Sequence, residues 1–63
     1  NAISPGGIYN NQPKKFLSNY KKDCINKGML NSEDLLSAFI FLIDDGSQYI
    51  NGQNIIVDDG WSL

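Results

Sequence analysis

The chain has 63 residues, a net charge of −2, one cysteine and no histidine. An internal disulfide is excluded, and a zinc site would have to use one thiolate and carboxylates, so we expect no metal. No signal peptide is present and the longest apolar run, residues 38–43, is too short to cross a bilayer, which favours a cytoplasmic protein with no membrane partner.

The charges are unevenly distributed along the chain. All five lysines lie between Lys14 and Lys27, with only Asp23 among them, and the other six acidic residues follow residue 30. A lysine-bearing helix could meet nucleic acid or phosphate. The chain is acidic as a whole and lacks the arginine needed for bidentate contacts, so we expect a solvated helix face and no nucleic-acid partner.

The first half of the chain predicts a strand, a loop and a helix. Residues 1–4 are typical of the end of a buried strand, which stops where a proline and two glycines follow. A polar loop is predicted over residues 5–12. A helix is predicted over about 13–26, with Gly28 ending it, because apolar side chains recur at helical spacing: Phe16, Leu17, Tyr20 and Cys24.

The most apolar stretch is a second helix, predicted over about 32–43. Asn31 is a good N-cap, and Glu33 and Asp34 place negative charge at the positive end of the helix dipole. From Leu35 to Ile43 one residue is polar, so apolar side chains point in nearly every direction around the axis. Such a helix must be covered on most sides.

The last predicted element is a strand over about 53–57. Its consecutive Ile55, Ile56 and Val57 indicate burial on both faces, as in the interior of a parallel sheet. The acidic pairs Asp44-Asp45 and Asp58-Asp59 follow a helix and a strand, so we expect them to cap turns, and not to bind metal or act as acid and base.

This order of strand, loop, helix, helix and strand predicts an α/β unit in which a crossover joins two parallel strands. Two strands are not a complete sheet. We therefore expect other protein to supply the neighbouring strands.

Five short motifs, in this order and spacing, resemble the C-terminal quarter of the short-chain dehydrogenases/reductases. They are Asn1-Ala-Ile-Ser-Pro-Gly-Gly-Ile8, Gly28-Met29, Asp34-Leu35 with Phe41-Leu42, Tyr49-Ile-Asn-Gly-Gln53 and Val57-Asp-Asp-Gly-Trp61. The resemblance covers essentially the whole chain. It implies that residues 1–63 are the C-terminal part of a single doubly wound, Rossmann-type α/β domain, in an oxidoreductase that uses NAD or NADP.

The resemblance also implies the cofactor-binding residues. Pro5 and Gly6 would shape the wall beside the nicotinamide ring, and the backbone of Ile8 would bond its carboxamide. Asn10 stands where the family commonly has a threonine that helps to hold the cofactor. The stretch from Tyr9 through the lysine-bearing helix would be the substrate flap. Asp59 departs from the glycine that is more usual there, and we expect this change to affect packing or an interface more than chemistry.

Two parts of the family's machinery are missing from these residues. There is no glycine-rich phosphate loop, and the residues four positions after Tyr9, Tyr20 and Tyr49 are not lysine, so no Tyr-x-x-x-Lys is present. We therefore expect a fragment of an enzyme that transfers hydride between NAD(P) and a small alcohol or carbonyl compound, with the fragment inactive by itself and no catalytic residues in it.

The family resemblance also indicates what the chain contacts. Its partners would be the remainder of the same enzyme and further copies, giving a homo-oligomer through the helix at 32–43 and the strand at 53–57. The alternative is a non-catalytic dimerisation or interaction module. A phosphate- or nucleic-acid-binding peptide that uses Lys14 to Lys27 is a third possibility.

Overall fold

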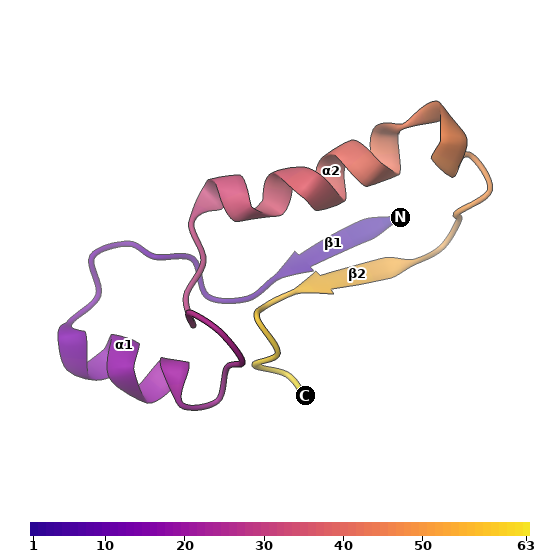
Figure 1. Cartoon of the computed structure of the whole chain (residues 1–63). Helices are drawn as coiled ribbons and strands as arrows, with labels where there is room; N and C mark the ends of the chain where they lie inside the picture. Colours follow the sequence, from indigo (N-terminus) through magenta and orange to yellow (C-terminus); the bar gives the residue numbers. More distant parts are fainter.

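The computed structural model describes all 63 residues as a small α/β unit with two parallel strands (Figure 1). Strands β1 and β2 pair in register, with Ile3 beside Ile55. The elements in chain order are β1 (Ala2–Pro5), α1 (Lys14–Lys21), the 3₁₀ helix η1 (Ser32–Leu35), α2 (Leu36–Ile43), the 3₁₀ helix η2 (Asp45–Ser47) and β2 (Asn54–Val57). The predicted fold class is therefore confirmed.

Helix α2 covers one face of the two-stranded sheet (Figure 1). Side chains alternate between faces along a strand, so Ile3 and its partner Ile55 share a face, and Ile3 lies with Phe39 and Leu42 of α2 around a small pocket. Ile56 points to the opposite face and is 56% exposed. The expectation of burial on both faces is thus met on one face only, because this chain supplies no layer for the other.

Helix α1 is shorter than the predicted 13–26, since it ends at Lys21. The backbone then tightens, with the N–H of Asp23 and of Cys24 donating three residues back. The next donor turns to a distant acceptor, as the Ile25 N–H donates to the carbonyl of Asp59 at 2.8 Å. The predicted helix is thus replaced after Lys21 by local turns and, from Ile25 on, by hydrogen bonds to Asp59.

The helix predicted over 32–43 forms as the 3₁₀ turn η1 followed by α2. Asn31 is the N-cap residue as expected, and its backbone N–H donates to the Asp34 carboxylate at 2.7 Å. At the other end, the Asp44 carboxylate accepts from the N–H of Gly46 at 2.8 Å. Both acids therefore satisfy backbone donors that a helix or turn leaves free.

The chain does not enclose a core of its own. Only four residues are buried, namely Gly28, Leu30, Ser47 and Asp58, and only Leu30 among them has a large apolar side chain. The radius of gyration is 13.5 Å, whereas a compact domain of this length would have about 11 Å. Apolar side chains along α2 stay exposed, including Ile40 at 61% and Ile43 at 78%.

No helix in the structure combines the length and hydrophobicity of a membrane-spanning segment.

Candidate functional site

The loop after β1 is held at its base by one backbone bridge. Ile8 and Leu30 pair in parallel: the Leu30 N–H donates to the Gly7 carbonyl at 2.8 Å, and the Tyr9 N–H donates to the Leu30 carbonyl at 2.7 Å. In such a pair the N–H and C=O of Ile8 itself point away from Leu30. The Ile8 carbonyl accepts from Nε2 of Gln12 at 3.2 Å. The Ile8 N–H has no partner within the chain.

Gln12 braces the same loop from its other end. Its side-chain oxygen accepts from the Asn10 N–H at 2.7 Å, while its amide nitrogen donates to Ile8. The Asn10 side chain is exposed and makes no hydrogen bond, so its carboxamide remains available. Sequence reasoning missed the role of Gln12, because a polar loop residue gives no sign of which backbone groups it will bind.

Gly6 and Gly7 are required by close approach of the chain to itself. A Cβ at Gly6 would lie 2.5 Å from the Cβ and 2.9 Å from the Cα of Asp58. A Cβ at Gly7 would lie 2.7 Å from the terminal methyl of Met29. The Gly6 N–H donates to the Val57 carbonyl at 2.9 Å, which continues the pairing of β1 with β2 beyond Pro5. The two glycines therefore have a packing role within the chain.

Tyr20 connects α1 to this loop and was assigned from the sequence only to an apolar helix face. Its hydroxyl oxygen accepts from the Gly7 N–H at 2.8 Å. Its ring stacks on Trp61, with ring centroids 5.7 Å apart and planes 7° from parallel. Helical spacing predicted that this side chain faces inward, but not the partner of its hydroxyl, which lies 13 residues away.

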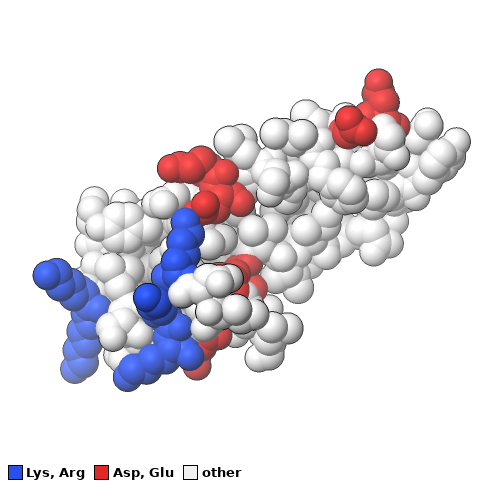
Figure 2. Space-filling view, in the orientation of Figure 1, with Lys and Arg blue, Asp and Glu red and all other residues white.

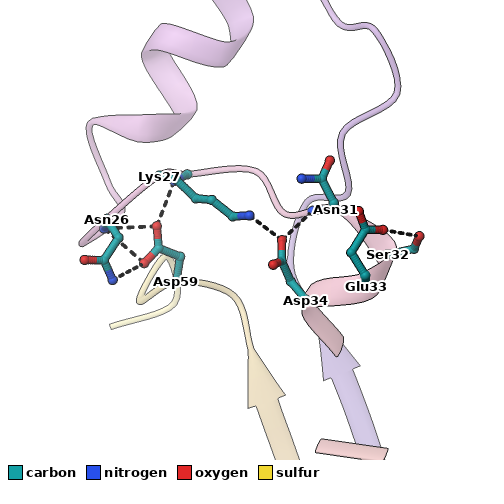
Figure 3. A network of polar contacts seen from close by, with 8 residues as sticks. Asn26, Lys27, Asn31, Ser32, Glu33, Asp34 and Asp59 are labelled. Atoms are coloured by element: carbon teal, nitrogen blue, oxygen red, sulfur yellow. Dashed lines mark hydrogen bonds and ion pairs between the residues drawn. The ribbon is translucent and has the colours of Figure 1, made fainter. Parts of the chain in front are cut away.

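Asp59 connects the end of the chain to the segment that follows α1 (Figure 3). Its carboxylate accepts from the backbone N–H of Asn26 at 3.0 Å, from the side-chain amide of Asn26 at 3.0 Å and from the Gly28 N–H at 2.7 Å. The hydrogen bond from Gly28 contributes most to holding the pKa of Asp59 below its ordinary value. This acid anchors backbone and is not poised for proton transfer.

Two other carboxylates are also occupied by structural contacts. Buried Asp58 accepts from the N–H groups of Gly60 at 3.0 Å and Ser62 at 3.1 Å, and its hydrogen bonds from Ser62 lower its pKa. Asp34 forms an ion pair with Lys27, and this contact is the main reason that its pKa is lowered. The expectation that the pair Asp58-Asp59 caps a turn agrees with the contacts of Asp58, whereas Asp59 bonds residues more than 30 positions away instead of its own turn.

The lysines gather at one end of the molecule, over α1 and the segment after it (Figure 2). Lys14, Lys15, Lys21 and Lys22 are all exposed. None of them forms an ion pair within the chain, and Lys22 reaches only the side chain of Asn19, at 3.5 Å. Their arrangement is that of a solvated helix face.

Comparison with known proteins decides the family. A family model described as enoyl-(acyl carrier protein) reductase matches residues 1–62. The chain is 46% identical over all 63 residues to the post-translational flagellin modification protein A of Campylobacter coli. It is 36% identical, in an alignment that covers 95% of its length, to the 3-oxoacyl-[acyl-carrier-protein] reductase FabG of Chlamydia trachomatis. The chain belongs to the short-chain dehydrogenase/reductase family.

A solved member of the family has the same fold. The crystal structure of a short chain dehydrogenase from Leptospira borgpetersenii with bound NAD+ matches 97% of the chain with a TM-score of 0.90 and 39% sequence identity. The chain covers 24% of that structure, 25% of the Campylobacter coli protein and 26% of the Chlamydia trachomatis protein. It therefore spans about a quarter of the length of the relatives that it matches.

Asp59 has a backbone conformation that is uncommon for residues other than glycine. Its φ is 55°, in the left-handed region that glycine adopts without strain and that aspartate tolerates better than most residues.

Proposed function

We propose that this chain is the C-terminal quarter of an NAD(P)-dependent oxidoreductase and that its loop 5–12 lies beside the nicotinamide of the cofactor. The family and the NAD+-bound neighbour support this proposal. The observation that carries it is the unpaired N–H of Ile8, which sits between two residues whose backbone groups are fixed to Leu30. When bound, NAD(P) accepts or donates the hydride.

Each residue of the loop has a distinct part in this proposal. The Ile8 N–H donates to the carboxamide oxygen of the nicotinamide and fixes the rotation of the ring. Asn10 offers a free side-chain amide at the position of the family's threonine. Pro5 and Gly6 form the wall, in which proline restricts the backbone and glycine lets it lie against Asp58. The phosphate loop and the proton-transfer residues belong to the rest of the enzyme.

Ile8→Pro in the full-length protein tests this arrangement, because it removes the N–H and keeps an apolar side chain. Losing one hydrogen bond should weaken NADH binding about three- to tenfold. Ile8→Val keeps the N–H and is the matched control. ADP-ribose, which lacks the nicotinamide, should bind all three proteins equally. The proposal fails if Ile8→Pro binds NADH as tightly as the control does.

We further propose that the parent enzyme acts on a sugar derivative in the modification of flagellin. The support is the identity of 46% to the Campylobacter coli flagellin modification protein. The full-length protein should restore the mass of modified flagellin, measured by mass spectrometry, in a Campylobacter coli strain that lacks its own copy. Unrestored flagellin mass despite normal expression would contradict this assignment.

A second candidate substrate is a 3-oxoacyl thioester. It is favoured by the 3-oxoacyl-[acyl-carrier-protein] reductase FabG of Chlamydia trachomatis, which is 36% identical. Reduction of acetoacetyl-CoA by the full-length protein with NADH or NADPH would separate the two candidates. Rapid reduction together with a failure to restore flagellin would favour the acyl substrate.

The open surfaces of the chain support a proposal about its partners. We propose that the remainder of the enzyme and a second copy of it cover α2 and β2, where apolar side chains are exposed. The single cysteine and the cofactor use favour the cytoplasm as its location. The mass of the natural chain distinguishes the enzyme from a free-standing interaction module. A mass about four times 7.0 kDa supports the enzyme, and a mass of 7.0 kDa supports the module.

A further inference from the structure

Residues 9–29 form an excursion that leaves the loop after Ile8 and returns at Leu30. The Ile8–Leu30 bridge fixes its base. Apart from the partly exposed Lys27–Asp34 ion pair, it is attached to the rest of the chain beyond the base at two places (Figure 3 shows the second). One is Tyr20, through its hydroxyl and its stacking on Trp61, and the other is the segment 25–28, through Asp59.

The attachment through Asp59 is the more extensive of the two. Its main-chain carbonyl accepts from Ile25 at 2.8 Å, and its two carboxylate oxygens accept from the three donors of Asn26 and Gly28. Hydrogen bonds to a charged acceptor are stronger than those between neutral groups. The partners are 31 to 34 residues apart in sequence, so this contact joins the far end of the excursion to the C-terminal turn.

We propose that Asp59 is a positioning residue that holds the excursion 9–29 against the C-terminal turn and thereby slows the release of the nicotinamide cofactor. This inference rests on the proposed function, because it places the nicotinamide beside Ile8, one residue before the excursion begins. Without the carboxylate, the far end keeps only the Ile25 hydrogen bond to the carbonyl of residue 59 and the partly exposed Lys27–Asp34 ion pair. The excursion then moves away from the C-terminal turn more often, and the nicotinamide ring is exposed to solvent more often.

Three variants of the full-length protein separate this role from general stability. Asp59→Gly removes every side-chain acceptor and suits the φ of 55°. Asp59→Asn supplies one acceptor oxygen instead of two and should keep part of the attachment. Lys27→Met is the matched control, because Lys27 lies between Asn26 and Gly28 but pairs with Asp34, and an exposed pair of this kind contributes little.

Hydrogen exchange at the amides of Asn26 and Gly28 measures the attachment itself, and the dissociation rate of NADH, followed by its fluorescence, measures the consequence. In Asp59→Gly both amides should exchange faster and NADH should dissociate about tenfold faster, while ADP-ribose dissociates as in the wild type. Asp59→Asn should give intermediate rates. Lys27→Met should match the wild type in both measurements.

Unchanged exchange in Asp59→Gly would overturn the proposal, since the attachment would then not depend on the carboxylate. Faster exchange with an unchanged NADH rate would also overturn it, since the excursion would then not control the cofactor. If ADP-ribose dissociated from Asp59→Gly as much faster as NADH does, the cause would be a general loss of structure, and this would overturn the proposal as well. A wild-type protein that does not bind NADH would refute the proposed function instead, and the exchange measurement would still decide whether Asp59 holds the excursion.

Discussion

Gly6 and Gly7 are adjacent in sequence, but they differ in what surrounds them. The space beside Gly6 is filled by Asp58, including its Cα, whereas the space beside Gly7 is filled by the mobile end of the Met29 side chain and by the ring of Tyr20. A Cβ can displace a flexible side chain more easily than it can displace backbone. The same substitution should therefore have different costs at the two positions.

Gly6→Ala in the full-length protein should lower the free energy of unfolding by about 1–3 kcal/mol. Gly7→Ala is the matched comparison and should cost less, because the Met29 methyl can move aside. Urea denaturation of the two variants and the wild type measures the difference. A larger loss for Gly7→Ala would contradict the packing described here.

The three hydrogen-bonded carboxylates predict how stability depends on pH. Asp34, Asp58 and Asp59 have folded-state pKa values below their ordinary 3.8. Their contribution to stability is therefore complete well above pH 3.8, and it is lost as the pH falls through the folded-state values, since the unfolded state takes up protons first. Asp59→Asn should lose less stability than the wild type on acidification.

Urea denaturation between neutral pH and pH values below 3.8 would measure this difference. Asp45→Asn is the control, because the Asp45 carboxylate accepts no hydrogen bond, and it should follow the wild type. If both variants lost stability in parallel with the wild type, the hydrogen bonds to Asp59 would not be responsible.

At the scale of the elements, α1 and α2 are fixed in different ways. Helix α1 has no buried residue and is held through the Tyr20 hydroxyl, the Tyr20–Trp61 stack and the segment that Asp59 anchors. Helix α2 lies along the sheet and exposes large apolar side chains on its other sides. The first helix thus depends on a few specific contacts, and the second depends on burial that this chain provides only in part.

Ile40→Lys should weaken assembly of the full-length protein, because a charge placed in an apolar interface is costly to bury. Light scattering after size-exclusion chromatography would measure a lower molar mass than that of the wild type. Glu33→Lys adds the same cation to the polar first turn and should leave the mass unchanged. An unchanged mass in Ile40→Lys, with a normal thermal transition, would show that α2 lies outside the subunit interface.

At the scale of the whole molecule, the surface is too open for independent stability. A chain in which only one large apolar side chain is buried cannot offset the conformational entropy of ordering 63 residues. The elements are instead arranged as one edge of a larger sheet.

The isolated 63-residue chain should therefore show no cooperative thermal transition by circular dichroism and no binding of NADH. The full-length protein is the control and should show both. A cooperative transition in the isolated peptide at monomer concentration would contradict the dependence on additional protein.

The sequence by itself determined the elements and their order, because each is encoded locally. The apolar run of 35–43, the Asn31 cap and the strand-ending Pro5-Gly6-Gly7 are readable from neighbouring residues. The family motifs added the candidate residues Pro5, Gly6, Ile8 and Asn10, whose contacts with a cofactor stay predictions. The open amide of Ile8 could not be read from sequence, since it depends on pairing with Leu30.

Only the tertiary structure decided where α1 ends, what Tyr20 bonds and what Asp59 does. Helix α1 ends at Lys21, and the backbone donors of Ile25 and Asn26, which the sequence placed in the helix, bond Asp59 more than 30 residues away in the chain. Gly28, whose N–H also donates to the Asp59 carboxylate, is 31 residues from Asp59 in the chain. Local sequence fixes backbone propensity and polarity, but the partner of a hydrogen bond that spans the chain is set by how the elements pack.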